Sequence, residues 1–208
     1  MKKQKGIWIP EKDTWYGWSE NFESREYKKL QLGGNLCLDI GAHVGIWTKR
    51  LSRDFFQVLC FEPLQKHIEC HKKNCTENNI TLNEFALSNK ETTLNMKVGT
   101  GRNTGRSTLE YKSKLVKGAN EIIKINTKTL DSLNLPRVDF MKIDVEKHEI
   151  SLIQGGRETI NRCKPIIFIE DHHYFYRKEG VPTGVDWLST MGYRVEDYLG
   201  SYNYLLRA

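Results

Sequence analysis

Long apolar runs and regularly spaced cysteines are both missing from this sequence. No stretch approaches the roughly 20 apolar residues of a membrane-spanning helix, and the basic residues 1–5 lead into Gly-Ile-Trp-Ile-Pro rather than into the apolar core of a signal peptide. The five cysteines are odd in number and form no C-x-x-C pair, so a disulfide framework is not expected. These absences argue against a membrane partner and favour a cytoplasmic protein with reduced thiols.

Internal repeats and low-complexity segments are absent too, and 208 residues, 38% of them hydrophobic, suffice for one domain with a full core. We expect this domain to span residues 35–208. Residues 1–34 carry three of the five tryptophans but show no clear hydrophobic period. They predict an N-terminal aromatic-rich cover, partly helical from about residue 19 to residue 32, whose rings either latch it to the core or line a ligand pocket.

Apolar runs of strand length alternate with helical patterns along most of the chain. The predicted strands are 36–40, 57–62, 80–86, 92–98, 121–126, 138–144 and 165–170. The predicted helices are 46–53, 64–78, a short one from 129, one from 149 that is interrupted near 155–156, and 184–191. This alternation predicts an α/β fold with a mainly parallel sheet flanked by helices. Residues 193–197 and 202–207 predict a C-terminal antiparallel strand pair.

A glycine-containing corner follows the first central strand. The segment 36–47 reads Leu-Cys-Leu-Asp-Ile-Gly-Ala-His-Val-Gly-Ile-Trp, which predicts a strand, a tight turn and a helix. Gly41 lets the chain turn and leaves no Cβ between backbone and ligand, while Gly45 permits close packing where the helix begins. Glu62 ends the next predicted strand, 23 positions after Asp39 (62 − 39 = 23). At the tip of a neighbouring strand, its carboxylate can accept both hydroxyls of a ribose.

Three kinds of ligand would suit such a corner. A dinucleotide fingerprint needs G-x-G-x-x-G, and here only Gly41 and Gly45 are present. A phosphate-binding P-loop needs G-x-x-x-x-G-K-[ST], but its nearest counterpart, 100–107, has Thr and Arg in place of the first Gly and the Lys. The remaining pattern, D-x-G-x-x-x-G with a distal Glu, is typical of S-adenosylmethionine (AdoMet) sites, in which a carboxylate suits the cationic amino acid moiety.

Titratable side chains gather at the predicted carboxyl ends of the strands, where open α/β sheets bind their ligands. They are Asp39, Glu62, Asp144, Glu146, His148, Glu170, Asp171, His172 and His173, and Ala86, Leu87 and Ser88 lie at a further strand end. Methyl transfer needs an acceptor oxygen in line with the sulfonium methyl and a base matched to the acidity of the acceptor. The candidate bases are Glu146, His148, His172 and His173, and the sequence does not choose among them.

A metal ion is a second option at these strand ends. Asp144, Glu170 and Asp171 could converge on Mg²⁺, which would polarise an acceptor hydroxyl; this layout resembles that of catechol-type and antibiotic-sugar metal-dependent methyltransferases. Against it, adjacent residues of a strand point to opposite faces unless the strand has ended. His67, Cys70, His71 and Cys75 of the second predicted helix do not complete a zinc-ligand face, and we interpret them as surface and packing residues.

Positive charge is concentrated between residues 97 and 128. This segment has eight basic and two acidic residues, and its balance of 8 − 2 = +6 equals the excess of the whole chain. A solvated face or mobile loop is the favoured explanation, and a patch for an anionic substrate or a nucleic acid is the alternative. The glycine-rich stretch 99–105 lies between two predicted strands, where it could close over a ligand.

Together these segments resemble the FkbM family of AdoMet-dependent methyltransferases. The matching stretches, in family order, are 38–45, 61–63, 85–88, 103–107, 129–131, 141–146, 155–156 and 169–170. The resemblance implies a Rossmann-like methyltransferase fold, AdoMet as methyl donor, and usually O-methylation of a hydroxyl on a sugar or natural product. One departure is Lys147, which stands where the family often has glycine, beside the expected acceptor site.

The resemblance also implies roles for particular residues. The predicted cofactor contacts are Asp39, Gly41, His43, Gly45, Glu62, Pro63, Ala86, Leu87 and Asp144. Asp144 is expected near the reacting centre, and the further catalytic candidates are Glu146, His148, Glu170 and His172. We therefore expect residues 35–208 to form an AdoMet-dependent O-methyltransferase domain whose acceptor is a carbohydrate-like or anionic small molecule.

Two other functions stay open. A nucleic-acid methyltransferase could use the basic segment 97–128, although methylation of base amino groups commonly uses an Asn/Asp-Pro-Pro-aromatic segment and this chain has Asp-Val-Glu at 144–146. The other alternative is a non-catalytic module that binds AdoMet or a nucleotide. The sequence does not identify the acceptor, the oligomeric state or the use of a metal.

Overall fold

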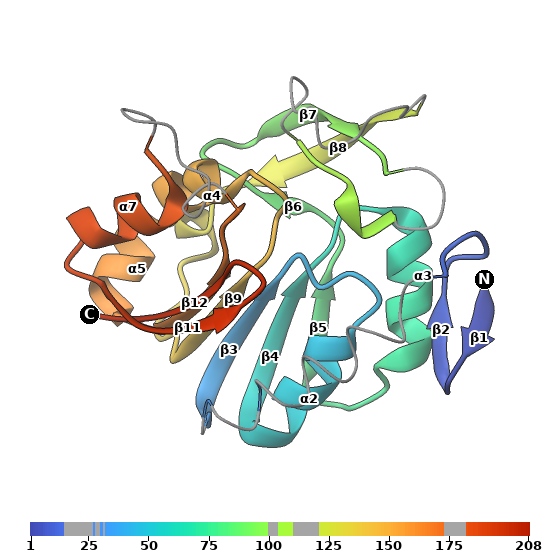
Figure 1. The fold of residues 1–208 in the computed structure, drawn as a ribbon, viewed down its shortest axis with the longest axis horizontal. Coiled ribbons are helices and arrows are strands. Elements are labelled where there is room, and N and C mark those ends of the chain that lie inside the picture. The colour runs from blue at the N-terminus through green and yellow to red at the C-terminus, as the bar shows by residue number, and fades with distance from the viewer. Residues whose placement is uncertain (15–26, 28–29, 31, 100–103, 110–120, 173–181) are drawn as a thin grey trace.

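The structure, a computed structural model, describes residues 1–14, 27, 30, 32–99, 104–109, 121–172 and 182–208. Its centre is a seven-stranded sheet in the order β11-β12-β10-β9-β3-β4-β5 (Figure 1). The strands are β3 (Gly34–Ile40), β4 (Phe55–Phe61), β5 (Ile80–Asn83), β9 (Phe140–Ile143), β10 (Ile166–Glu170), β11 (Arg194–Gly200) and β12 (Asn203–Arg207). From β5 to β10 neighbours pair in parallel, and β12 and β11 add the antiparallel pair. The predicted fold class is therefore confirmed.

Helices flank both faces of this sheet. They include α2 (Ile46–Asp54), α3 (Gln65–Asn74), α4 (Glu149–Gly155), α5 (Arg157–Cys163) and α7 (Gly184–Thr190). Successive side chains of β3 point to opposite faces, so Leu38 joins the core cluster of α4, α5 and α7, whereas Cys37 joins the cluster that contains Leu51 of α2. A sheet covered on both faces reads as continuous apolar runs, and this explains why its strands were visible in the sequence.

A second, three-stranded sheet lies across the carboxyl ends of the central strands (Figure 1). It consists of β6 (Ala86–Leu87), β8 (Ile122–Lys128) and β7 (Thr92–Lys97). The predicted strand 80–86 thus belongs to two sheets, because β5 ends at Asn83, beside the end of its partner β4 at Phe61, and the chain then crosses to pair Ala86 with Thr127. This crossing carries Ala86 and Leu87 to the mouth of the central sheet.

An N-terminal hairpin, β1 (Lys2–Gln4) with β2 (Ile7–Ile9), was not predicted. Its two turn residues, Lys5 and Gly6, have φ values of 48° and 87°, the left-handed pair that a tight hairpin turn requires. The hairpin packs on α3, where Asn74 Oδ1 accepts from the backbone N–H of Trp8 at 2.8 Å. The other aromatic residues of the expected cover, at positions 15, 16, 18 and 22, lie outside the described residues, as does nearly all of the helix expected from residue 19 to residue 32.

The predicted interruption near 155–156 separates α4 from α5. A Cβ on Gly155 would come within 1.9 Å of the carbonyl oxygen of Ser88, so this helix end and the loop after β6 are in close contact. Short 3-10 turns occur at η1 (Thr104–Arg106) and at η2 (Asp131–Leu133), the latter where a short helix was predicted. Among the described residues, we find no helix that combines the length and the apolar character needed to cross a membrane.

Candidate active site

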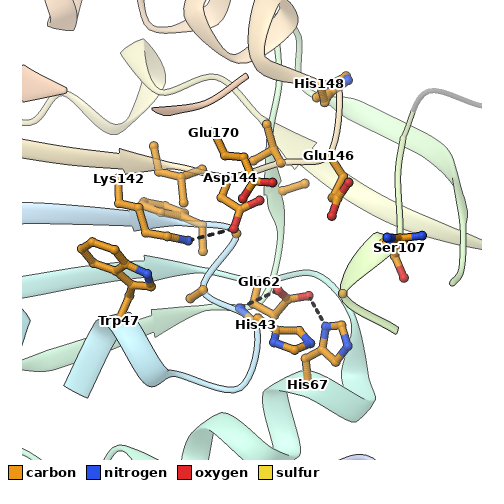
Figure 2. A pocket seen from close by; sticks show the side chains of 18 of the residues that line it. His43, Trp47, Glu62, His67, Ser107, Lys142, Asp144, Glu146, His148 and Glu170 are labelled. Atoms are coloured by element: carbon orange, nitrogen blue, oxygen red, sulfur yellow. Dashed lines mark hydrogen bonds and ion pairs between the residues drawn. The ribbon is translucent and has the colours of Figure 1, made fainter. Parts of the chain in front are cut away.

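A cavity of about 560 Å³ opens at the carboxyl ends of β3, β4, β9 and β10, beneath η1 and the residues after it (Figure 2). Most of the predicted site residues line it. They are Gly41, His43, Glu62, Pro63, Ala86, Leu87, Asp144, Glu146, His148, Glu170 and His172. Asp39, Gly45 and Asp171 do not line this cavity. The topology therefore brings together residues that are more than 120 positions apart in sequence, as His43 and His172 are (172 − 43 = 129).

The two glycines of the corner make room for protein atoms. Gly41 (φ 82°) and Gly45 (φ 89°) both adopt the left-handed conformation. A Cβ on Gly41 would lie 1.8 Å from the carbonyl oxygen of Asp144, and one on Gly45 would lie 2.4 Å from Sγ of Cys75. Gly41 lines the cavity, as expected for a ligand-facing glycine, and its missing side chain also lets the corner touch the end of β9. Gly45 instead lets α2 start against α3.

Asp39 lies behind the cavity wall. Its side chain is fully buried, and its Oδ2 accepts a hydrogen bond of 2.6 Å from the hydroxyl of Thr48. Its Oδ1 lies 3.7 Å from Nζ of Lys142, the residue opposite it on β9. A direct contact between Asp39 and the cofactor, as predicted, does not follow from this geometry. The carboxylate instead orients Lys142, which itself lines the cavity.

Glu62 sits at the end of β4 with its carboxylate surrounded by donors (Figure 2). Oε2 accepts from the N–H of His43 at 2.9 Å, and Oε1 accepts from the N–H of Leu64 at 2.9 Å. Oε1 also lies 3.2 Å from Nδ1 of His67. Burial alone would raise the pKa of Glu62, but His67 and the two N–H groups outweigh it and hold this pKa below its usual value.

His67 was interpreted as a surface or packing residue, and the structure corrects this. Its side chain is 3% exposed and lines the cavity, with Nε2 2.9 Å from the hydroxyl of Thr104. Its ring packs edge-on against that of His43, with 4.1 Å between the centroids. Burial and the neighbouring cationic groups hold the pKa of His43 well below its usual value. The sequence signal for His67 was its position on the first turn of the helix after Glu62-Pro63.

On the opposite wall, Asp144, Glu146 and Glu170 line the same part of the cavity, and the pKa values of Glu146 and Glu170 are raised. Burial, followed by repulsion from Asp144 and Glu170, holds the pKa of Glu146 well above its usual value. Burial and Asp144 raise the pKa of Glu170, although His172 offsets part of the effect. Nζ of Lys142 lies 3.3 Å from Oδ2 of Asp144 and is the cation within this group (Figure 2).

Two histidines reach this wall from different elements. Nε2 of His172 lies 2.7 Å from Oε1 of Glu170, and its ring packs against that of Tyr202 with 4.2 Å between centroids. His148, just before α4, is buried and has its Nε2 2.9 Å from the hydroxyl of Ser88. A carboxylate that holds one ring nitrogen of a histidine fixes the orientation of the ring and leaves the other nitrogen for a substrate. His173 lies outside the described residues.

The predicted metal ligands do not converge. Asp171 is 1% exposed, and its Oδ2 accepts from the backbone N–H of Val185 at 3.0 Å, on the far side of the strand end from Asp144 and Glu170. Within the described part of the chain, one group of three His, Cys, Asp or Glu residues has ligand atoms within 4.8 Å of one another. It is Asp13, His43 and His67.

The segment 104–109 forms the roof of the cavity. The glycine-rich stretch 99–105 was predicted to close over a ligand; its residues 100–103 lie outside the described residues. Gly105, Arg106, Ser107 and Leu109 line the cavity. The hydroxyl of Thr108 donates to the carbonyl of Glu146 at 2.5 Å, so the roof is tied to the carboxylate wall. Sequence reasoning missed this contact because it joins segments almost forty positions apart.

Lys147 is not among the residues that line the cavity. Glu146 (φ 49°) and Lys147 (φ 78°) are consecutive left-handed residues, which explains in backbone terms why glycine suits this position. The departure from the family pattern therefore concerns the backbone and not the acceptor space. Of the basic residues between 97 and 128, Arg106 lines the cavity and Lys124 and Lys128 are exposed on β8, while positions 102, 112, 114 and 117 lie outside the described residues.

Three solved structures share this fold. An FkbM methyltransferase from Methylobacillus flagellatus is 15% identical with a TM-score of 0.53, and the match covers 86% of this chain but only 44% of that one. A precorrin-6y C5,15-methyltransferase from Geobacter metallireducens is 14% identical with a TM-score of 0.52, covering 91% and 79%. The N-methyltransferase NodS from Bradyrhizobium japonicum, in complex with S-adenosylhomocysteine, is 10% identical with a TM-score of 0.51, covering 94% and 90%.

At such identities the likeness shows the fold alone, and no curated protein matches the chain. The sequence itself is more specific. Residues 39–206, most of the chain, match the methyltransferase FkbM domain. This match begins at Asp39, near the end of β3, and ends within β12, so it includes the other strands of the central sheet and the glycine corner after β3. The chain therefore belongs to the FkbM methyltransferase family.

Proposed function

We propose that this protein transfers the methyl group of AdoMet to a hydroxyl oxygen of a sugar or another polar small molecule. One observation carries the proposal: a single cavity has an ionised, donor-held carboxylate, Glu62, on one wall and a carboxylate–imidazole pair, Glu170 and His172, on the other. The first is suited to binding a ribose and the second to accepting the proton of an acceptor hydroxyl. Membership of the FkbM family supports AdoMet as the donor.

On the cofactor side, the donors around Glu62 keep its carboxylate ionised and fixed in position. A carboxylate has about four lone-pair sites, and three of these face protein donors, so one is left for a ribose hydroxyl. Asp144 lines the same cavity from the opposite wall, where its carboxylate would favour a positive sulfonium between the two walls. The role of Asp39 is indirect, through Lys142.

On the acceptor side, we assign His172 as the base. Its Nε2–H donates to Glu170, so Nδ1 is free to accept the proton of the acceptor hydroxyl. As that proton leaves, an oxygen lone pair forms a bond to the methyl carbon, the methyl–sulfur bond breaks, and sulfur keeps the electron pair. The products are the methyl ether, S-adenosylhomocysteine (SAH) and protonated His172. Glu170 stabilises this imidazolium and Tyr202 supports the ring from one face.

The acceptor is proposed to be an uncharged polar molecule rather than an anion. The carboxyl groups of Asp144, Glu146 and Glu170 line the acceptor wall. Arg106 also lines the cavity, but its charge offsets only part of the rise in the pKa of Glu146. Carboxylates accept hydroxyl protons well, and they repel anions. A polyhydroxylated molecule therefore fits this wall better than a nucleic acid or a phosphate does.

The proposed reaction uses no metal ion. Asp171 is turned toward α7, so the carboxylates that could have held Mg²⁺ are reduced to Asp144 and Glu170. One or two carboxylates with waters can hold Mg²⁺, but Glu170 is paired with His172 at 2.7 Å, which supports its use in proton transfer instead. Full turnover in excess chelator is the expected result. Loss of turnover that Mg²⁺ restores would reinstate the metal.

The test is uptake of labelled methyl groups from AdoMet by a panel of sugars, nucleotide sugars and oligonucleotides. We expect transfer to a sugar hydroxyl, recovered as an alkali-stable ether. Transfer to oligonucleotides, together with a salt-sensitive gel shift, would favour the nucleic-acid alternative. SAH binding measured by calorimetry without transfer to any acceptor would favour the binding-module alternative.

A further inference from the structure

We propose that His67, Thr104 and Asp13 form a positioning relay for Glu62, through which the N-terminal segment completes the cofactor site. The proposal rests on the ribose role of Glu62 proposed above. None of the three touches a predicted reaction centre, and Asp13 precedes the matched family domain, which begins at residue 39. The inference is therefore that a residue outside this domain controls how well the domain binds its cofactor.

The relay is a continuous line of buried polar contacts. Oε1 of Glu62 lies 3.2 Å from Nδ1 of His67, and Nε2 of His67 lies 2.9 Å from the hydroxyl of Thr104. That hydroxyl donates to Oδ2 of Asp13 at 2.5 Å. All four side chains belong to residues that are 5% exposed or less. Hydrogen bonds in such an environment are stronger than in water, and each is costly to lose.

The direction of these hydrogen bonds can be deduced from proton counting. A threonine hydroxyl has one proton, and Thr104 gives it to the carboxylate of Asp13. The same hydroxyl can then only accept from His67, so Nε2 of His67 carries a proton. Only a second proton, on Nδ1, makes the contact with Glu62 a charge-assisted bond. Glu62 and Asp13 are thus the two acceptors at the ends of one line of contacts through His67 and Thr104.

The relay also ties the roof of the cavity to its floor. Thr104 is the first residue of η1, and the three residues that follow it line the cavity. Four residues later, Thr108 holds the carbonyl of Glu146 on the acceptor wall. The segment 104–109 is therefore fixed at one end by the cofactor carboxylate and at the other by the acceptor carboxylates. Loosening Thr104 should move both Glu62 and the roof above it.

A metal ion is the competing use of the same residues, since ligand atoms of Asp13, His43 and His67 lie within 4.8 Å of one another. The contacts favour the relay, because the hydroxyl of Thr104 already lies within hydrogen-bond distance of both Asp13 and His67. Zinc bonds to nitrogen and oxygen are about 2.0–2.2 Å long, so a zinc ion there would have to displace that hydroxyl. The metal content of the purified protein distinguishes the two.

The experiment measures the Kd of SAH by calorimetry on the full chain. We expect Thr104→Val and Asp13→Asn each to weaken SAH binding about five- to twentyfold. Thr104→Val removes the hydroxyl that joins His67 to Asp13, and Asp13→Asn removes the charge that strengthens the hydrogen bond from Thr104. Thr104→Ser keeps the hydroxyl and should restore the affinity. Glu11→Gln, on an exposed side chain of the same segment, is the matched control and should leave Kd unchanged.

A double-mutant cycle separates positioning from a general loss of structure. In a Glu62→Gln background, Thr104→Val should weaken SAH binding much less than it does in the wild type, because the carboxylate that it positions is gone. With a responsive acceptor in hand, Thr104→Val should raise the KM for AdoMet more than it lowers kcat. If Thr104→Val does not fold, the same double-mutant cycle is measured with Asp13→Asn in place of Thr104→Val.

Three results would overturn the relay. The first is a wild-type Kd in Thr104→Val and Asp13→Asn while Glu62→Ala still weakens binding, which leaves the proposed function intact. The second is that Thr104→Val weakens SAH binding by the same factor in the wild type and in the Glu62→Gln background. The third is a stoichiometric metal that disappears in Asp13→Asn. If Glu62→Ala itself leaves SAH affinity unchanged, the ribose role fails first and the relay with it.

Discussion

The two walls of the cavity use the same functional group in opposite ways. On the cofactor wall, Glu62 is surrounded by N–H groups and a histidine, and its pKa is lowered. On the acceptor wall, Glu146 and Glu170 are surrounded by other carboxylates, and their pKa values are raised. Both walls are at the ends of parallel strands and both are buried. What differs is the charge and the hydrogen-bond donors of their neighbours.

This difference separates binding from proton transfer. A carboxylate whose pKa is lowered stays ionised and accepts hydrogen bonds without exchanging a proton at neutral pH. Carboxyl groups whose pKa values are raised hold a proton more tightly, so they are suited to sharing a proton with His172 and with a substrate. Substitutions on the first wall should therefore change affinity, and substitutions on the second wall should change turnover. The predictions below test this division, from the largest expected effect to the smallest.

His172→Phe keeps an aromatic ring against Tyr202 and removes the base. We expect kcat to fall about 10²- to 10⁴-fold, the usual contribution of a positioned base, with the Kd of SAH unchanged. Single-turnover rates and calorimetry measure the two quantities separately. A large loss of SAH affinity in this variant would contradict the division between the walls.

Gly41→Ala places a Cβ 1.8 Å from the carbonyl oxygen of Asp144 in a left-handed backbone. We expect the free energy of unfolding to fall by about 3 kcal/mol or more, from the clash and the conformational strain together. Gly192→Ala is the matched control, because Gly192 has a similar φ of 90° and nothing within 4 Å of its Cβ direction. That control should lose only about 1–2 kcal/mol. Equal losses in denaturant titrations would remove the contact between the corner and β9 from the explanation.

Glu62→Ala should weaken SAH binding by about 1–3 kcal/mol, the value of charge-assisted hydrogen bonds. Glu84→Ala, on a half-exposed carboxylate that pairs with Lys72, is the control and should bind SAH like the wild type. Calorimetry at pH 7 measures both variants. An unchanged affinity in Glu62→Ala would refute the ribose role.

Glu149, buried behind the acceptor wall, has a pKa that burial raises to about 8 from a usual value of 4.5. Since the folded protein binds this proton more tightly than the unfolded chain, the contribution to stability is complete below about pH 4.5 and is lost as the pH rises to about 8. The slope for one such group is at most about 1.4 kcal/mol per pH unit. Glu149→Gln should flatten the stability–pH curve in this window. An unaltered curve from denaturant titrations would show that Glu149 is ionised in the folded protein.

Lys147→Gly should raise the free energy of unfolding by less than about 1 kcal/mol, because Lys147 holds a φ of 78° that costs glycine little. Since the side chain does not line the cavity, kcat and the KM for the acceptor should stay as they are. A changed acceptor preference would instead place Lys147 in the acceptor site, as the sequence alone suggested.

The parts that sequence predicted well are those set by local pattern. The continuous apolar runs of β3, β4 and β10 are visible because both faces of the sheet are buried. The helix from residue 149 was expected to break near 155–156, and it does. Glu62 and the carboxylates after β9 and β10 do reach one cavity, because strand ends of a parallel sheet meet at one edge.

The parts that it missed depend on contacts between distant segments. The side of the strand end on which a residue lies decides its partners. Asp39 therefore faces Thr48 instead of the cavity, and Asp171 faces α7 instead of Glu170. His67 lines the cavity and contacts Thr104, a residue 37 positions away in the sequence. The contact between Gly41 and the backbone of Asp144 could likewise not be predicted, because it joins two distant segments. A local pattern contains no information on these partners.

The three-stranded sheet above the cavity has a consequence for how this scaffold can diversify. Its strands β6, β7 and β8 come from one uninterrupted stretch of sequence, inserted between the edge strand β5 and the central strand β9. Both ends of the insertion return to the same rim, so exchanging it leaves the order of the seven central strands intact. Grafting this stretch between relatives while keeping Ala86, Leu87 and Thr104, which we place on the cofactor side, is therefore a route to new acceptors on the same donor platform.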